Sequence, residues 1–385
     1  MKYQNTLLFI LLLTLSACSY SNYIVIKNVA VFDGDQVYEE MNFVFADSTI
    51  IDISNKNKTY KQATIIDGTG MTIIPPLLNA HVHVRDAQNL KEALDVGIFA
   101  LMDQFTTDRR ANYLRTFNDS TGYARYFSSN VGATVPGGHG TQYNVVIPTI
   151  NDTLSPAQFV QDRIAANADY IKITQEHTME KLSGAQLRGI TTAAHQHGKV
   201  AIAHISTLTD GMEAVKEGVD GLAHLWYRQG AISSAADLGM MKQKKVFIIP
   251  TLSVIQKVIA QAEKMGAADQ YLSFEEVLKE LKKAYDNGVP ILAGTDSPNY
   301  GMDFTVQLFD ELELLSGAGL SNIDVLKSAT THIYTYFKLE GFGRLAKKEA
   351  ASFSLIQGKP HLAIQDLKAP KRVWKAGLEI SEGWN

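Results

Sequence analysis

Cysteine is almost absent from this sequence, because only one of its 385 residues, Cys18, is a cysteine. No disulfide can therefore form within the chain. A basic cluster is also missing: 36 Lys and Arg stand against 40 Asp and Glu, and this balance argues against nucleic acid as a partner. Beyond residue 18 the sequence has no apolar run long enough to span a bilayer, no low-complexity tract and no short repeat. The remaining composition is that of an ordinary globular protein, with 45% hydrophobic and 20% charged residues.

The longest apolar run lies at the N-terminus, in MKYQNTLLFILLLTLSAC. One early cation, Lys2, precedes an apolar stretch that is too short to cross a membrane and is typical of a secretory signal. The segment LSAC, which ends at Cys18, resembles a bacterial lipobox, in which cleavage precedes a cysteine that is then lipidated. We expect residues 1–18 to be a lipoprotein signal peptide and the mature protein to be exported and anchored through Cys18, on the periplasmic side or at the surface of a bacterial envelope. The alternative is an ordinary signal with a stray cysteine.

Two kinds of pattern follow the signal. Residues 19–74 and 343–385 show β-type alternation with turn signals, and we expect them to meet as one small β-sandwich domain built from both chain ends. Residues 75–342 alternate short apolar strands with amphipathic helical stretches, which matches a (β/α)8 TIM barrel and an α/β fold class. The first expected strand precedes His81, and the others are 97–105, 125–134, 168–174, 199–206, 218–226, 245–252 and 288–297.

Polar side chains stand at the ends of several expected strands. Catalytic groups in such barrels lie at the C-terminal ends of the strands, so residues from different strands would meet there. Imidazole and carboxylate are ligands of first-row metals, and neutral imidazole suits zinc. Each residue also has an ordinary interpretation, as a core histidine, a turn aspartate or a lysine that reaches the surface, but these interpretations would all have to hold together. The candidate ligands are His81 and His83 on the first strand, Lys172 on the fourth, His204 on the fifth, His224 on the sixth and Asp296 on the eighth.

This set of residues resembles the amidohydrolase superfamily of metal-dependent hydrolases. In that family the first strand ends in His-x-His, a lysine follows on strand four, histidines end strands five and six, and an aspartate ends strand eight. The segments PGGHG, ADYIKI, AAHQHGKVAIAH and GVPILAGTDS are similar to the imidazolonepropionase-like and Xaa-Pro dipeptidase-like branch. Pro76 and Asn79 depart from the usual glycine and aspartate, and SATTHIY and ASFSLI also depart from the family pattern. These departures weaken the transfer of a substrate from any one relative.

The resemblance implies a binuclear metal site. Carboxylated Lys172 would bridge two divalent ions, with zinc as the default by ligand type. One ion would be bound by the two histidines of the first strand together with Asp296, and the other by His204 and His224. Asp296 would also be the catalytic group, because it would accept the proton of the attacking hydroxide.

Weaker signals concern the substrate. His139, in the glycine-rich loop after the third strand, could contact a substrate oxyanion or carboxylate. Tyr227 and Arg228, just past His224, could do the same, because arginine suits bidentate recognition of a carboxylate. The alternative is that Tyr227 and Arg228 are ordinary loop residues.

The predicted function is hydrolysis of an amide or peptide bond, including that of a dipeptide, by a metal-activated bridging hydroxide. The expected partner is a small molecule or short peptide, and homo-oligomerisation is left open. Three alternatives remain: a mononuclear hydrolase of cyclic amides, a hydrolase of lactones or phosphotriesters, and an inactive lipoprotein that binds a substrate without cleaving it. Lys172 argues against the mononuclear enzyme, because mononuclear relatives do without that lysine.

Overall fold

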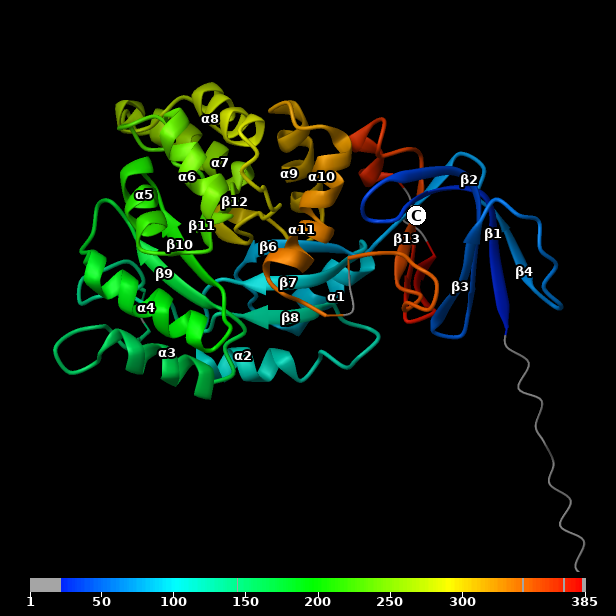
Figure 1. Cartoon of the computed structure of the whole chain (residues 1–385), viewed down its shortest axis with the longest axis horizontal. Coiled ribbons are helices and arrows are strands. Elements are labelled where there is room, and N and C mark those ends of the chain that lie inside the picture. Colours follow the sequence, from blue (N-terminus) through cyan, green and yellow to red (C-terminus); the bar gives the residue numbers. More distant parts are fainter. Residues whose placement is uncertain (1–21, 144, 341–342, 370, 383–385) are drawn as a thin grey trace, which may run out of the picture.

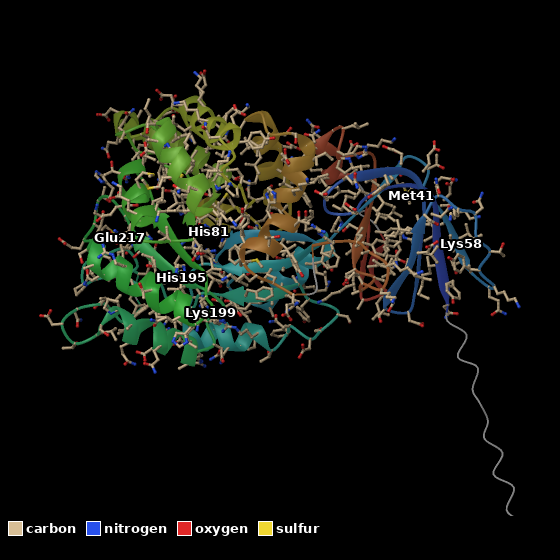
Figure 2. The ribbon with its side chains drawn as sticks, viewed as in Figure 1. Met41, Lys58, His81, His195, Lys199 and Glu217 are labelled. Atoms are coloured by element: carbon tan, nitrogen blue, oxygen red, sulfur yellow. The ribbon has the colours of Figure 1, made fainter. Side chains whose placement is uncertain are left out.

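The computed structural model of the protein describes residues 22–143, 145–340, 343–369 and 371–382. The expected signal peptide, its lipobox and Cys18 lie outside these residues. Figure 1 shows two parts, one with strands surrounded by helices and one with a sheet built from both ends of the chain. Figure 2 places His81 in the first part and Met41 and Lys58 in the second. None of the helices within the described stretches combines the length and the apolar character needed to cross a bilayer.

Parallel strands form the centre of the first part. They make two sheets, with the orders β6-β7-β8 and β12-β11-β10-β9, and every neighbouring pair is parallel. A helix lies between each strand and the next along the chain, as parallel pairing requires. The strands are β6 (Leu77–Val82), β7 (Ile98–Asp103), β8 (Arg125–Ser128), β9 (Ile171–Gln175), β10 (Ala201–Ile205), β11 (Gly221–Ala223) and β12 (Phe247–Ile249).

Two further contacts join these sheets into a TIM-barrel-like arrangement. On one side Ala133 bridges in parallel to Ile173. On the other side residues 289–297 run between β12 and β6 and form a parallel bridge to each of them. One apolar cluster collects side chains from six of the strands and from this segment, among them Leu78, Ala100, Phe127, Ile202, Ala223, Phe247 and Leu292.

The eighth expected strand differs from the prediction, whereas the other seven are present with altered bounds, which are mostly shorter. Residues 288–297 are predicted as a strand, but the segment is held by isolated bridges rather than by a continuous ladder. A Cβ at Gly294 would lie only 2.9 Å from the backbone nitrogen of His81, so glycine is needed for this close approach. Asp296 has a φ of 66°, and this left-handed conformation turns the chain out of strand geometry.

Helices cover the outside of the parallel strands (Figure 1). Their ends follow from the local sequence: Ser273 and Glu276 form a capping box at the start of α8, and Gly288 follows its end with a φ of 78°. The helices are α1 (Ala87–Asp95), α2 (Asp108–Arg115), α3 (Pro156–Ala165), α4 (Gly184–Gln196), α5 (Leu208–Lys216), α6 (Ala235–Lys244), α7 (Leu252–Lys264), α8 (Phe274–Asp286), α9 (Val306–Gly317), α10 (Asn322–Ser328) and α11 (Thr331–Tyr336).

Both chain ends contribute to the second part, as the sequence predicts. Antiparallel pairing of β5 with β13 joins them into one sheet with the order β15-β14-β13-β5-β1-β2-β3, and β4 pairs with β1. The strands are β1 (Tyr23–Phe32), β2 (Val37–Ala46), β3 (Thr49–Ser54), β4 (Thr64–Asp67), β5 (Met71–Ile74), β13 (Phe353–Gln357), β14 (Lys371–Lys375) and β15 (Leu378–Glu382).

This sheet curls over its own core. Strands β2 and β13 are three positions apart in the order, which would separate them by roughly 14 Å in a flat sheet. The ring centroids of Phe43 on β2 and Phe353 on β13 are nevertheless 4.8 Å apart. Trp374 on β14 stacks on Phe353 with a centroid distance of 4.9 Å. Facing aromatic rings from distant strands thus make the core of the second part.

Candidate metal centre

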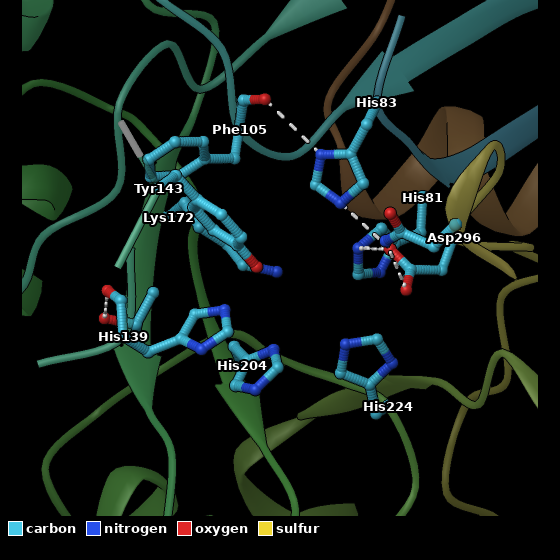
Figure 3. Close-up of a pocket in the computed structure, with 11 residues that line it drawn as sticks. His81, His83, Phe105, His139, Tyr143, Lys172, His204, His224 and Asp296 are labelled. Carbon is cyan, nitrogen blue, oxygen red and sulfur yellow. Dashed lines mark hydrogen bonds and ion pairs between the residues drawn. The ribbon is translucent and has the colours of Figure 1, made fainter. Parts of the chain in front are cut away.

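The end of β6 supplies two histidines. Pairing of β6 with β7 shifts register between Asn79 and Val82, so His81 lies within this irregularity and His83 just past it, and both point into a cavity (Figure 3). Their Nε2 atoms lie 3.1 and 2.9 Å from the same oxygen, Oδ1 of Asp296. Ligand atoms about 3 Å apart are what bonds of about 2.1 Å to one small cation require. Each of the two histidines therefore lies at a distance from the same carboxylate oxygen that suits a pair of ligands on one ion.

In two of the histidines, a hydrogen bond made by one ring nitrogen determines that the other nitrogen faces the cavity. The Nδ1 of His83 lies 3.3 Å from the carbonyl oxygen of Phe105, to which its N–H donates. The Nδ1 of His224 lies 2.7 Å from the hydroxyl of Thr251. Both rings thereby keep Nε2 for the cavity, as metal-binding histidines commonly do when their other nitrogen is hydrogen-bonded.

His204 and His224 form the opposite side of the cavity. His204 stands near the end of β10, His224 directly follows β11, and their ring centroids are 4.7 Å apart. His224 has a φ of 74°, so the chain turns at this residue. The potential ligand atoms of His81, His224 and Asp296 all lie within 4.8 Å of one another. The two sides of the cavity are thus close enough to share bound cations.

Lys172 lies between these two sides. Its neighbours Ile171 and Ile173 pack in the large apolar core, so strand alternation turns Lys172 the other way. Its Nζ is buried and finds no hydrogen-bond partner among the described residues, and Figure 3 shows the amine pointing into the cavity. Burial lowers the pKa of Lys172 to about 7. A substantial share of this amine is therefore neutral, and hence nucleophilic, near pH 7.

The charges of the site suit a cation. Burial alone would raise the pKa of Asp296, but the neighbouring His81 and His83 hold it well below its ordinary value. Burial lowers the pKa of His81 to about 3. At neutral pH the carboxylate is ionised and this imidazole is neutral, so neither carries the additional positive charge or proton that would oppose a bound cation. The side-chain amide of Asn299 donates to Oδ2 of Asp296 over 3.0 Å, which leaves Oδ1 to the histidines.

The cavity has a volume of about 280 Å³. His139 lines it, as the sequence predicts, and stacks on His204 with ring centroids 4.5 Å apart and an interplanar angle of 13°. All six predicted ligands line the same cavity, which is bounded by His81, His83, Phe105, His139, Tyr143, Lys172, Thr174, His204, His224, Asp296 and Asn299.

Tyr227 and Arg228 are not part of this lining. Tyr227 stacks on Tyr271 at 6.0 Å, and the guanidinium of Arg228 lies 4.9 Å from the centre of the same ring. The Nε of Arg228 is 3.5 Å from Oε1 of Glu176, which in turn contacts His204. The structure therefore places the pair beside the cavity, behind Glu176, and their role in substrate binding stays a prediction.

Sequence reasoning missed several residues of the site. Phe105, Tyr143 and Asn299 line the cavity, and Glu176 and Thr251 contact its histidines. Asn299 and Glu176 could have been found, because each follows a predicted ligand at a strand end by three or four positions. Phe105 and Tyr143 carry no such signal, since apolar residues in loops are common.

Comparisons with known proteins agree with this geometry. Residues 72–379 match the model of the amidohydrolase family. A search of the curated proteins found no match.

Solved structures show the same fold at low sequence identity. A Xaa-Pro dipeptidase with bound methionine in its active site is 20% identical, with a TM-score of 0.78 over 93% of this chain and 99% of that one. An ochratoxinase of A. niger is 20% identical, with a TM-score of 0.75 over 93% and 95% of the two chains. A molinate hydrolase is 16% identical, with a TM-score of 0.76 over 94% and 95%. At these identities the likeness establishes the fold alone.

Proposed function

The chain belongs to the amidohydrolase family, and from this premise we propose that it is a binuclear metal-dependent hydrolase that cleaves an amide or peptide bond. The observation that carries the proposal is the position of Lys172. Its buried amine has no hydrogen-bond partner among the described residues and points between two groups of imidazoles. A lysine in a strand has no structural reason to be placed there, since burial of an unpaired amine is costly.

The residues fit a pair of divalent ions. His83 and His224 each engage one ring nitrogen in the surrounding protein and keep the other for the cavity. The two histidines of β6 and Asp296 would hold one ion, His204 and His224 would hold the other, and carboxylated Lys172 would bridge them. Such ions, zinc by ligand type, would supply an activated hydroxide and polarise the scissile carbonyl.

Asp296 is suited to receive a proton in this reaction. Its carboxylate is ionised at neutral pH, and Asn299 holds Oδ2 while Oδ1 faces the two histidines. A fixed carboxylate beside the attacking oxygen can accept its proton and pass it to the leaving amine. We assign this catalytic role to Asp296.

We propose a small amide or a dipeptide as the substrate. The cavity of about 280 Å³ suits a molecule of this size. Among the proteins of similar fold are a Xaa-Pro dipeptidase, an ochratoxinase and a molinate hydrolase, whose names describe small substrates. His139 would contact the substrate directly, and Arg228 and Tyr227 would contact a substrate carboxylate beyond Glu176.

A mononuclear hydrolase is the second candidate. The close grouping of His81, His224 and Asp296, whose ligand atoms lie within 4.8 Å of one another, favours it because these three residues alone could hold one ion. Lys172 would then have no partner in the site, which is why we prefer the binuclear enzyme.

Three further proposals concern the whole chain. We propose that the two parallel sheets and residues 289–297 close into one (β/α)8 barrel over residues 75–342. Residues 19–74 and 343–385 would form a β-sandwich, which the facing rings of Phe43 and Phe353 support. We also propose that residues 1–18 are a lipoprotein signal and that Cys18 anchors the protein to a bacterial envelope membrane.

A hydrolysis screen tests the activity. The purified protein, loaded with zinc and bicarbonate, would be offered dipeptides, N-acyl amino acids and cyclic amides, and amine release would be measured. We expect turnover of at least one linear amide, a loss of at least about 100-fold in Asp296→Asn and none in the exposed Asp286→Asn. Turnover of cyclic amides alone would favour the mononuclear enzyme, and no turnover of any amide by the loaded protein would contradict the proposal.

A further inference from the structure

Glu176 joins the ends of three neighbouring strands beside the cavity. It follows β9 directly and is only 7% exposed. Its Oε2 lies 3.2 Å from Nε2 of His204. Its Oε1 accepts a hydrogen bond from the hydroxyl of Ser206 over 3.1 Å and lies 3.5 Å from Nε of Arg228. One carboxylate therefore contacts the candidate ligand His204 and also the loop that follows a second candidate ligand, His224.

The contact with His204 determines how that ring is protonated. An ionised carboxylate can only accept hydrogen bonds, so this contact places a proton on Nε2 of His204. Nδ1 is then the nitrogen of His204 that remains to bind a metal ion. His224 is arranged the other way round, because its Nδ1 is engaged by Thr251 and its Nε2 is left for the cavity. These two rings thus present different nitrogens to the cavity, and each choice is made by a neighbouring group.

The ring of His204 cannot easily turn to another arrangement. His139 stacks on one face with centroids 4.5 Å apart, and His224 lies at its edge at 4.7 Å (Figure 3). Rotation of the ring would break both contacts as well as the hydrogen bond to Glu176. The carboxylate is itself fixed from the other side, because Thr178 donates to Oε1 through its hydroxyl over 3.2 Å.

We propose that Glu176 is a positioning residue that holds His204 with Nδ1 toward the cavity and so sets the affinity of the second metal position. The inference rests on the proposed binuclear function. Glu176 is not itself placed as a ligand, because its two oxygens are engaged by His204, Ser206 and Thr178.

The same carboxylate connects this metal position with the loop that carries the predicted substrate residues. The backbone N–H groups of Tyr227 and Arg228 both donate to the carbonyl of Ser206, over 3.1 and 3.0 Å. Glu176 holds the hydroxyl of Ser206 and faces the guanidinium of Arg228. Loss of the carboxylate would therefore loosen His204 and Arg228 together.

The test compares Glu176→Gln with Glu180→Gln. Glu180 is an exposed residue in the same segment, so its substitution is a matched control. An amide can either donate or accept, so Glu176→Gln no longer dictates the proton position on His204. The first readout is the tautomer of His204 in the metal-free full chain, measured by nitrogen NMR of labelled histidine and assigned with His204→Gln. The second readout is the dissociation constant of each zinc ion, measured by competition with a chelator.

We expect the Nε2–H tautomer in the wild type and in Glu180→Gln, and a mixture of tautomers in Glu176→Gln. We also expect the weaker zinc to dissociate about 10- to 100-fold more readily in Glu176→Gln, with the tighter zinc unchanged. Glu176→Asp keeps the acceptor and should retain the wild-type tautomer, which separates this role from a general folding defect. An unchanged tautomer and unchanged zinc affinities in Glu176→Gln would overturn the inference.

These readouts also separate the two proposals. A wild-type protein that binds one zinc or none contradicts the binuclear function. The tautomer of His204 in the metal-free chain still decides, independently of any metal, whether Glu176 sets the orientation of this ring.

Discussion

The side-chain amide of Asn79 donates a hydrogen bond to the hydroxyl of Thr295 over 3.0 Å, and this contact ties the two ligand-bearing segments together just below the cavity. The side-chain oxygen Oδ1 of Asn79 accepts hydrogen bonds from the backbone N–H groups of His81 and Thr295, both over 3.2 Å. One buried side chain therefore fixes the backbone beside His81 and beside Asp296. Asn79 is a departure from the family pattern in sequence, but it satisfies the local hydrogen bonds.

Removal of this side chain should destabilise the protein. We expect Asn79→Ala to lower the free energy of unfolding by about 1–3 kcal/mol, because the backbone N–H of His81 loses this acceptor and that of Thr295 is left with only the carbonyl of His81. Asn79→Asp should cost less, since a carboxylate still accepts from both N–H groups and the hydroxyl of Thr295 can turn to donate. Urea denaturation of the metal-free proteins measures both changes, and an Asn79→Ala protein as stable as the wild type would refute this role.

His139 should affect turnover without affecting metal binding. It lines the cavity but is not placed as a ligand, and burial lowers its pKa to about 3, so it is a neutral hydrogen-bonding group at working pH. We expect His139→Ala to lower kcat/KM by about 10- to 100-fold, as the loss of one substrate hydrogen bond would. Zinc content should stay at the wild-type level, and the exposed His197→Ala should change neither quantity. A loss of zinc in His139→Ala would instead make this residue part of the metal site.

Glu311 should make stability depend on pH. It is fully buried on α9 and accepts hydrogen bonds from the backbone N–H groups of Leu252 and Ser253 at the start of α7, both over 2.8 Å. Burial raises the pKa of Glu311 to about 7. Its protonated form is therefore favoured by folding, so its contribution to stability is complete below about pH 4.5 and is lost as the pH rises through about 7.

The comparison is between wild type and Glu311→Gln, by urea denaturation without metal at pH 5 and pH 8. The wild type should lose of the order of 2–3 kcal/mol relative to the variant between these two values. The variant is expected to have a lower free energy of unfolding than the wild type at both pH values, because an amide cannot accept from every donor that the carboxylate satisfies. Equal pH dependence in the two proteins would show that Glu311 is ionised throughout.

Cys18 should determine where the protein is found. Lipidation of this residue would hold the mature chain on a membrane, and more than one acyl chain is needed for stable anchoring. We expect the wild type to fractionate with membranes and to incorporate labelled palmitate, and Cys18→Ala to do neither. Labelling of Cys18→Ala at the wild-type level would mean that the lipid is attached elsewhere.

The fold was predictable from the sequence wherever the apolar pattern was regular. The alternation around Ile171 and Ile173 correctly turned Lys172 toward the cavity, and the pairing of the two chain ends followed from their β-rich patterns. The irregular eighth strand was not predictable in the same way. Its conformation depends on Gly294 packing against His81 and on the left-handed backbone of Asp296, which are contacts across the fold.

The candidate ligands were predictable because imidazole, carboxylate and lysine are conspicuous at strand ends. Their orientation was not, since it depends on residues such as Thr251 and Glu176, whose contacts join separate strands. Arg228 shows the opposite case. His224, on the same loop, lines the cavity as predicted, but the guanidinium of Arg228 lies over the ring of Tyr271 and the residue is not part of the lining. The side chains that gather at the cavity were thus easier to predict from the sequence than the contacts that orient them.

The central claim is that Lys172 bridges two metal ions, and metal content tests it most directly. Protein without residues 1–18 would be purified without chelators, supplied with zinc and bicarbonate, and analysed by elemental mass spectrometry. We predict about two equivalents of zinc per chain in the wild type and in the exposed Lys244→Ala, and no more than one in Lys172→Ala. One equivalent in all three proteins would contradict the bridge and favour a mononuclear enzyme, and no bound metal in any of them would contradict the metal-dependent hydrolase altogether.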